Sequence, residues 1–210
     1  MEWGPKHRAR SPVDGSVVTV RSATFASQAE QVGFMRDMVT EYRSTYTIHA
    51  LSRDIALRQS GCPAKDKRCH AIRLGEWVQR EITYVNEGTE TFQTPLHTLK
   101  CTWGDCDEFA TLTASMVESI GVPCELVAMG WNPPANGHGL PFGREIAGAW
   151  AKVFAGKQLR HIFCRAVLLK PGRPPLRLPL DATLDRPVGA LTDPLALALN
   201  QGLQVHTVIL

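Results

Sequence analysis

The sequence predicts an α+β domain in which helices from the first half of the chain pack on an antiparallel β-sheet from the second half. Apolar residues recur at helical spacing in several stretches between residues 28 and 120. From residue 124 onward, short apolar or alternating runs are separated by breaks rich in proline and glycine, which is typical of strands. Hydrophobic residues make up 44% of the 210 residues and charged residues 20%, so the chain can bury a core. Helices followed by strands are the order expected of an α+β fold.

Four helices are expected, and most of them have a start or stop signal in the sequence. The pattern Ser27-Gln28-Ala29-Glu30 is a capping box ahead of an apolar periodic stretch, and Gly61 and Gly121 each follow the last periodic residue of a helix. Pro123 supports the second of these stops, because proline cannot continue a helix. The expected helices cover residues 28–45, 48–59, 67–82 and 105–120.

Five strands are expected in the second half of the chain, and one more precedes the first helix. Residues 15–24 alternate loosely and predict this short strand, whereas residues 88–95 and 131–146 are expected to be loops because they carry glycine and proline. We expect a single domain over residues 25–210, preceded by an arm and the short strand in residues 1–24. The strands expected in the second half are 124–129, 147–154, 161–169, 176–181 and 205–210.

Charge and hydropathy exclude several classes of function. Twenty-three basic and 20 acidic residues give a net charge of +3, and basic residues cluster only in residues 6–10, so nucleic-acid binding is not expected. We expect this basic arm to be a solvated chain end. No apolar run is long enough to span a membrane, and no apolar segment of a secretory signal follows the first residues. The sequence therefore predicts a protein of the reducing cytoplasm.

The cysteines give no sign of a disulfide framework or a metal site. The six cysteines include no CxxC pair and are sparse, so most are expected to be small buried side chains. Cys62, Cys69 and His70 lie close together in sequence, but a zinc site needs a fourth ligand at ordinary spacing, and none is present. We expect no metal and no organic cofactor.

One cysteine differs from the others in its position. Cys106 lies in the first turn of an expected helix, directly after a glycine turn, in the stretch Trp-Gly-Asp-Cys-Asp-Glu-Phe-Ala. The N–H groups and the positive dipole end of a helix stabilise a thiolate, the nucleophilic form of cysteine, and can hold the oxyanion formed when it attacks an acyl carbon. Asp105, Asp107 and Glu108 oppose this effect, because nearby negative charge raises the pKa of a thiol. The ordinary role of these acids is to cap the helix.

A cysteine nucleophile needs a base, and the base needs an orienting group. His161 begins an expected strand, and Asp181 ends the next one. Neighbouring antiparallel strands lie ~4.8 Å apart, so the Asp181 carboxylate can reach the His161 ring, as in Cys-His-Asp sites. His138, on the expected loop 131–146, is a rival base, and this loop is a candidate lid. We favour His161 because a strand holds a base more firmly than a loop does, although His161 can also be an ordinary strand histidine.

The roles of several neighbouring residues stay open at this stage. Cys101 is either a redox partner of Cys106 or an ordinary loop cysteine. Trp77 and Trp103 either line the site or belong to the core, as most tryptophans do. The side chain of Thr183 can form a hydrogen bond with Asp181 and fix its carboxylate.

These motifs together resemble one family. The transglutaminase-like cysteine peptidase superfamily has motifs similar to Gly104-Asp105-Cys106-Asp107-Glu108-Phe109-Ala110, Gly121-Val122-Pro123, His161-Ile162-Phe163 and Leu180-Asp181-Ala182-Thr183. The resemblance covers about residues 72–188, and it includes Tyr84 and the helix before it. The motifs look most like members encoded by bacteria and their tailed phages. The resemblance implies a papain-like core with Cys106 as nucleophile, His161 as base and Asp181 as orienting group.

The expected function is thiol-dependent acyl transfer. The thiolate attacks an amide carbonyl, an acyl-thioester forms and water releases it, so we expect a cysteine peptidase or amidase with a peptide or other amide-bearing substrate. An amine acceptor would give transglutamination instead. The alternative is a structural or assembly component, such as a phage tail or virion protein, that uses the fold as a scaffold and binds protein partners through residues 25–65. Alkylation of Cys106 that is faster than that of the other five cysteines favours the enzyme.

Overall fold

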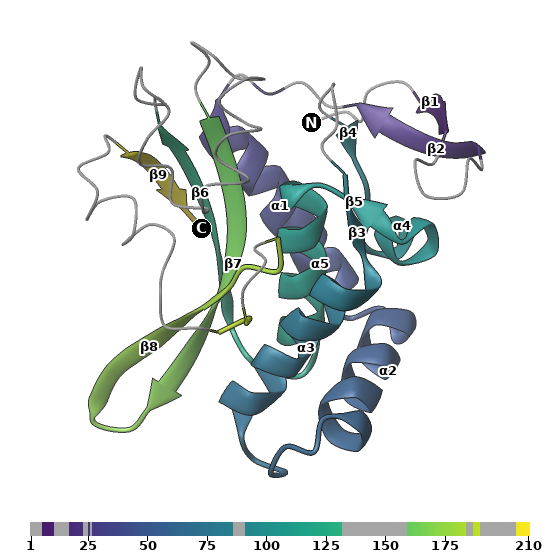
Figure 1. Ribbon diagram of the computed structural model, residues 1–210. Helices are drawn as coiled ribbons and strands as arrows, with labels where there is room; N and C mark the ends of the chain where they lie inside the picture. The colour runs from purple at the N-terminus through teal and green to yellow at the C-terminus, as the bar shows by residue number, and fades with distance from the viewer. Residues whose placement is uncertain are drawn as a thin grey trace.

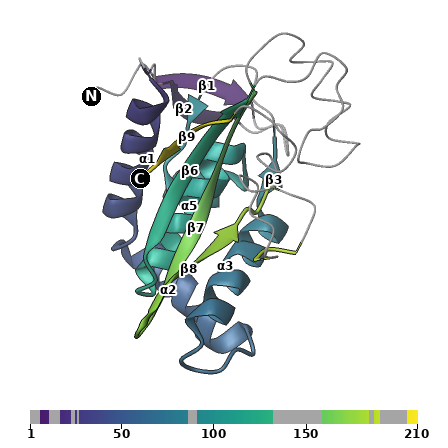
Figure 2. The same ribbon diagram turned by 90° about the vertical axis from the view of Figure 1, so that its left-hand side faces the viewer.

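The helices of this protein cover one face of an antiparallel sheet (Figures 1 and 2). The computed structural model describes residues 6–10, 17–22, 25, 27–85, 91–131, 159–183, 187–189 and 205–210. The elements in chain order are β1 (Lys6–Arg10), β2 (Val17–Ser22), α1 (Gln28–Tyr42), α2 (Tyr46–Asp54), a π-helical turn (Ile55–Gln59), α3 (Lys67–Glu81), β3 (Thr83–Tyr84), β4 (Thr91–Phe92), α4 (Pro95–Cys101), β5 (Trp103–Gly104), α5 (Cys106–Ser119), β6 (Cys124–Trp131), β7 (Leu159–Lys170), β8 (Arg173–Leu180) and β9 (Val205–Ile209).

The main sheet has four strands in the order β8-β7-β6-β9, and every pair in it is antiparallel. Cys164 lies opposite Leu180 in the pairing of β7 with β8. The residue after β8, Asp181, therefore comes next to β7 near His161, because diagonal neighbours on adjacent strands are within reach of long side chains. Two smaller sheets, β1-β2-β4 and the parallel pair β3-β5, lie at the other side of the helices. The predicted fold class, helices packed on an antiparallel sheet, is confirmed.

Helix α5 is the centre of the core. Every side chain from residue 107 to residue 117 is buried, so this helix has no solvent-exposed face over those three turns. A helix that is buried all round needs a cover on every side. Strand β7 packs against it on one side, and α1, α2 and α3 pack on the others (Figure 1). This packing fixes the direction of α5 and therefore the place where it begins.

Helices α1, α3, α4 and α5 each begin at a side-chain cap, as the sequence suggested for α1 and α5. The Ser27 hydroxyl accepts a hydrogen bond from the Glu30 N–H at the start of α1, and the Asp66 carboxylate accepts one from the Cys69 N–H in α3. The end of α5 is formed as predicted, because Gly121 has a φ of +76°, which favours glycine. None of the helices in the described ranges is long and apolar enough to cross a membrane.

Several expectations from the sequence are wrong in detail. The basic residues 6–10, expected as a solvated end, form β1, which pairs with β2. No helix was expected between the loop 88–95 and residue 105, but residues 95–101 form α4. Thr94 caps the His97 N–H, and Pro95 occupies the first turn, where proline needs no partner for a missing N–H. The single helix expected over 48–59 is α2 followed by the π-helical turn. The strand expected at 147–154 and nearly all of the loop 131–146 lie outside the described residues.

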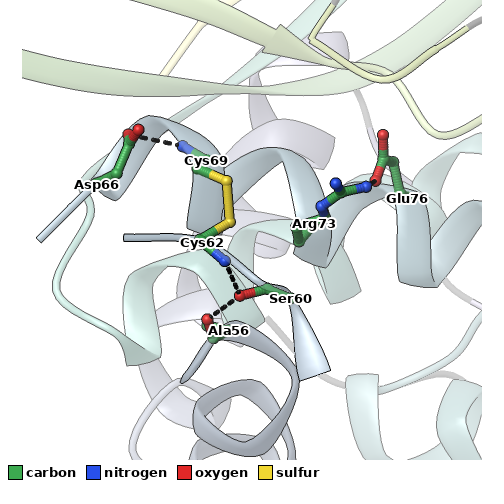
Figure 3. The surroundings of a disulfide bond; sticks show 7 residues. All are labelled: Ala56, Ser60, Cys62, Asp66, Cys69, Arg73 and Glu76. Carbon is green, nitrogen blue, oxygen red and sulfur yellow. Dashed lines mark hydrogen bonds and ion pairs between the residues drawn. A yellow bond between two sulfur atoms is a disulfide. The ribbon is translucent and has the colours of Figure 1, made fainter. Parts of the chain in front are cut away.

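Cys62 and Cys69 form a disulfide bond, which the sequence analysis did not predict (Figure 3). The bond joins the segment after the π-helical turn to the first turn of α3. The Ser60 hydroxyl accepts a hydrogen bond from the Cys62 N–H, and Asp66 caps the turn that carries Cys69. Neither cysteine is therefore the small buried thiol that we expected, and the zinc site considered for this pair is excluded. The bond is also of a kind typical of oxidising compartments.

Removing the disulfide should lower the stability of the fold without changing its architecture. The bond closes a short loop, with a sequence separation of 7 residues. The chain-entropy model assigns about 2.5 kcal/mol to a loop of this size. We expect the double variant Cys62→Ala/Cys69→Ala to lose about 2 kcal/mol of unfolding free energy in urea titration. A thiol count on the unreduced, denatured parent should find four reactive thiols, and a count of six would show that the bond is absent.

Candidate functional site

The site forms at the start of α5, where the buried carboxylate of Glu108 forms hydrogen bonds with Gln93 and with Asp105, the cap residue. Asp105 is the cap residue: its Oδ1 accepts a hydrogen bond from the Asp107 N–H at 3.0 Å. Glu108 completes a capping box, because its Oε2 accepts a hydrogen bond from the Asp105 N–H at 3.0 Å. Its other oxygen accepts from the Gln93 N–H at 2.9 Å. Because Glu108 is only 1% exposed, these bonds fix the position of Cys106, the first residue of α5.

Gly104 allows strand β5 to run directly against Glu108. A Cβ atom at position 104 would lie 2.5 Å from the Glu108 Cβ and 2.9 Å from its Cγ, which is too close for any side chain. The sequence analysis expected a glycine turn here, but Gly104 is the last residue of β5 and pairs with Tyr84. The glycine before Asp105 and Cys106 is therefore required by packing rather than by a turn.

The Cys106 side chain is half-buried between acidic groups and strand β7. Its Sγ donates a hydrogen bond to Asp107 Oδ1 at 3.6 Å, and the backbone of Ile162 in β7 forms a hydrogen bond with the sulfur. Burial, followed by the charges of Asp105 and Asp107, raises the pKa of the Cys106 thiol well above its ordinary value, and the bond from Ile162 offsets only part of this. The resting side chain is therefore a neutral thiol. Burial and these acids therefore outweigh the helix dipole, which alone would favour the thiolate.

His161 and Asp181 form a buried pair beside this thiol. The exposed fractions are 2% for His161 and 6% for Asp181. His161 Nε2 donates a hydrogen bond to Asp181 Oδ2 at 2.6 Å. The other carboxylate oxygen accepts two hydrogen bonds from Thr183, one from its N–H at 3.1 Å and one from its hydroxyl at 2.6 Å. Thr183 thus holds the carboxylate in the way that the sequence analysis considered.

The three residues expected to form the site lie at one end of α5. Ile162, which contacts the sulfur of Cys106, directly follows His161 in β7. Burial raises the pKa of the nearby Asp105 carboxyl; hydrogen bonds with Glu108 and Asp107, and an interaction with His161, lower it in part. His138, the rival base, lies outside the described residues.

Tyr84 brings a hydroxyl group to the same place. Strand β3 carries it next to Gly104, and its ring meets that of Phe109 edge-on at a centroid distance of 5.8 Å. Burial raises the pKa of the Tyr84 hydroxyl well above its ordinary value, and the nearby charges of Asp105 and Asp107 raise it further. The group therefore stays a neutral O–H donor. The sequence analysis noted this tyrosine only through its place in the family resemblance.

Gln31 is a polar residue of the site that the sequence analysis missed. It lies in α1, is 5% exposed, and donates a hydrogen bond from Nε2 to Asp107 Oδ2 at 2.8 Å. A signal was present in the sequence, because Gln31 shares one helical face with Met35 and Met38, which are both buried. A polar side chain on a buried face needs a partner. The identity of that partner depends on how α1 crosses α5.

The remaining residues considered from the sequence have other roles. Cys101 ends α4, a different helix from α5, and its Sγ lies 3.1 Å from His97 Nε2. Burial, followed by the charge of Lys100, lowers the pKa of His97, so the neutral imidazole can accept a hydrogen bond from the Cys101 thiol. Trp103 is buried, and Trp77 packs against the core.

A cluster of possible metal ligands does occur here, but its atoms are already engaged. The ligand-type atoms of Asp105, Cys106 and Asp107 lie within 4.8 Å of one another. Asp105 Oδ1 caps the helix, and the two oxygens of Asp107 accept from Gln31 and from the thiol. We therefore assign this cluster no metal.

A comparison with protein-family models identifies the fold family. Residues 53–162, just over half of the chain, match the model of the transglutaminase-like superfamily. The chain belongs to the transglutaminase-like superfamily. The matched segment begins in α2 and ends in β7, so it includes Cys106 and His161, and it leaves out Gln31 and Asp181.

Two solved structures are similar to this transglutaminase-like chain, at low sequence identity. A candidate cysteine protease from Cytophaga hutchinsonii is 15% identical, with a TM-score of 0.47 over 85% of this chain and 51% of that one. A candidate protease from Parabacteroides distasonis is 11% identical, with a TM-score of 0.45 over 88% of this chain and 40% of that one. This chain thus spans about half or less of the length of these proteins. No curated protein sequence matches it significantly.

Replacing Gly104 by alanine should disrupt the start of α5. The new Cβ would meet the Cβ of Glu108 at 2.5 Å, and neither the backbone of β5 nor the root of a buried side chain can move easily. We expect Gly104→Ala to lower the unfolding free energy by about 1–3 kcal/mol, measured by urea titration. Gly33→Ala is the matched control, because nothing lies within 4 Å of a Cβ there and alanine favours a helix. Equal effects of the two substitutions would contradict the close packing on Glu108.

Proposed function

We propose that this transglutaminase-like protein is a cysteine peptidase or amidase. Cys106 is the nucleophile, His161 the base and Asp181 the group that orients the base. The observation that carries the proposal is the buried 2.6 Å hydrogen bond from His161 to Asp181. His161 lies in β7, and the next residue of that strand, Ile162, contacts the Cys106 sulfur. Family membership supports a thiol-dependent enzyme. The substrate is a peptide or another compound with an amide bond.

The arrangement of the His161 ring supports its role as base. Nε2 carries the proton donated to Asp181, so Nδ1 is the acceptor nitrogen of the neutral ring. In the proposed reaction, Nδ1 accepts the proton of the Cys106 thiol as the sulfur attacks the amide carbonyl. Asp181 stabilises the positive imidazolium that results, and Thr183 keeps the carboxylate in place. Because the resting thiol is neutral, its activation depends on this base.

The later steps follow the acyl-thioester route. The carbonyl oxygen becomes an oxyanion, which the backbone N–H of Cys106 and the Tyr84 hydroxyl can stabilise, because the Asp105 cap already occupies the next N–H groups of α5. The imidazolium then gives its proton to the leaving amine, and the acyl group remains on sulfur. Water attacks this thioester with His161 again as base, which releases the acid and restores the thiol. An amine in place of water would yield a new amide.

Variants of the three residues test the proposal. We expect Cys106→Ala to abolish the release of new amino groups from casein and the incorporation of monodansylcadaverine, which report hydrolysis and transamidation. Asp181→Asn should lower kcat about 10³–10⁴-fold, because the imidazole loses its orienting charge. Cys101→Ser is the matched control, since it removes another half-buried thiol with a histidine partner and should leave activity unchanged.

The same assay separates the enzyme from the assembly component considered above. Loss of activity in Cys106→Ala but not in Cys101→Ser favours the enzyme. If the parent shows neither product and Cys106 is alkylated no faster than the buried Cys124 and Cys164, the fold serves as a scaffold.

Replacing the Tyr84 hydroxyl tests the oxyanion contact separately from the nucleophile. We expect Tyr84→Phe to lower kcat by about 10²-fold with little change in KM, as for removal of one oxyanion donor. The rate of Cys106 alkylation by iodoacetamide should not fall, because alkylation forms no oxyanion. An unchanged kcat would exclude this role for Tyr84.

A further inference from the structure

Helix α1 reaches the nucleophile through a chain of two hydrogen bonds. Gln31 Nε2 donates to Asp107 Oδ2 at 2.8 Å, and Cys106 Sγ donates to Asp107 Oδ1 at 3.6 Å. Gln31 and Asp107 are each 5% exposed, so water cannot easily replace either partner. The two oxygens of one carboxylate thus join a glutamine on α1 to the thiol on α5.

This geometry restricts the orientation of the Asp107 carboxylate. A bond at Oδ2 sets the rotation about χ2, and that rotation decides where Oδ1 points. Without the Gln31 amide, the buried carboxylate would lose a hydrogen bond to its charged form, which favours either rotation toward another donor or uptake of a proton. Rotation and protonation of Asp107 would each weaken the hydrogen bond from the Cys106 thiol to Asp107 Oδ1, which keeps the proton on sulfur.

We propose that Gln31 is a positioning residue that holds the Asp107 carboxylate against the Cys106 thiol and so keeps the nucleophile protonated in the resting protein. The inference rests on the proposed role of Cys106 as the nucleophile. Gln31 lies in α1, outside the matched family segment. Its hydrogen bond to Asp107 would disfavour the Cys106 thiolate until substrate and base act.

Several other charged or titratable groups face the thiol, and any test must keep them constant. On α5 these are Asp105 and Glu108, in addition to Asp107. From the neighbouring elements, the groups around the site are Tyr84 on β3, His161 on β7 and Asp181 after β8. Apart from Asp107, none of these residues is changed in the variants that test the proposal.

The experiment is the pH dependence of Cys106 alkylation by iodoacetamide, followed by peptide mass spectrometry in a Cys101→Ser background. We expect Asp107→Asn to lower the apparent pKa of Cys106, because it removes the negative charge that favours the thiol. Gln31→Leu should shift it in the same direction by a smaller amount, so that alkylation at pH 7 becomes about three- to tenfold faster. The double variant should match Asp107→Asn alone, since Gln31 acts only through that carboxylate.

A matched control separates positioning from a general loosening of α1. Arg36 also joins α1 to α5, through a 2.6 Å ion pair with Glu118 at the other end of α5. Arg36→Leu should lower the melting temperature but leave the pH profile of Cys106 unchanged. If Gln31→Leu leaves the profile unchanged, or if Arg36→Leu shifts it equally, the proposal is overturned.

Should Gln31→Leu fold poorly, Gln31→Met serves in its place, because it also lacks the amide and is closer in shape. The titration of Cys106 does not require turnover. An inactive protein with the expected shifts would therefore overturn the proposed function and leave the positioning role intact, and an active protein without the shifts would do the reverse.

Discussion

The position of Cys106 depends on the buried carboxylate of Glu108, because both of its oxygens accept hydrogen bonds from the backbone. A buried charge is costly unless its oxygens accept hydrogen bonds. Both Glu108 oxygens do so, one from Gln93 and one from Asp105. The segment before α4 and the start of α5 cannot separate without leaving that charge unpaired. Tyr84 is held by the same constraint, because β3 pairs with β5, and β5 packs on Glu108 through Gly104.

The acids that order the start of α5 also determine the chemistry available there. A helix end supplies about half a positive charge, whereas Asp105 and Asp107 supply negative charge beside the sulfur, in a partly buried site. The capping that fixes Cys106 in space therefore works against its ionisation. In the proposed reaction, the thiol therefore depends on a base that is firmly held, and His161 is held by Asp181, which Thr183 holds in turn. The start of α5 thus fixes the position of Cys106, whereas β7 and the end of β8 supply the proposed base and its orienting carboxylate.

The sequence was sufficient for features set by local pattern. The start of α5, its end at Gly121, the strand that carries His161 and the strand that ends just before Asp181 follow from capping residues and periodicity, and the structure has them. Two features that were missed depend on how the chain folds rather than on local pattern. The disulfide joins cysteines 7 residues apart without a CxxC spacing, and the bond from Gln31 joins residues 76 positions apart. Helix α4 was missed for a different reason, since Pro95 suggested a loop although Thr94 before it marks a helix start.

Helix α1 shows why the matched family segment is not a complete unit in this protein. The sequence suggested that residues 25–65 form a surface for partners, yet Val32, Met35 and Val39 are fully buried. Helix α1 covers one side of α5, and polar bonds join it to both ends of that helix, through Gln31 at Asp107 and through Arg36 at Glu118. Without α1, residues 53–162 would expose an apolar face of α5 and lose the amide that binds Asp107. Because these polar groups lie at the two ends of one apolar interface, the packing that stabilises the core also sets the surroundings of the thiol.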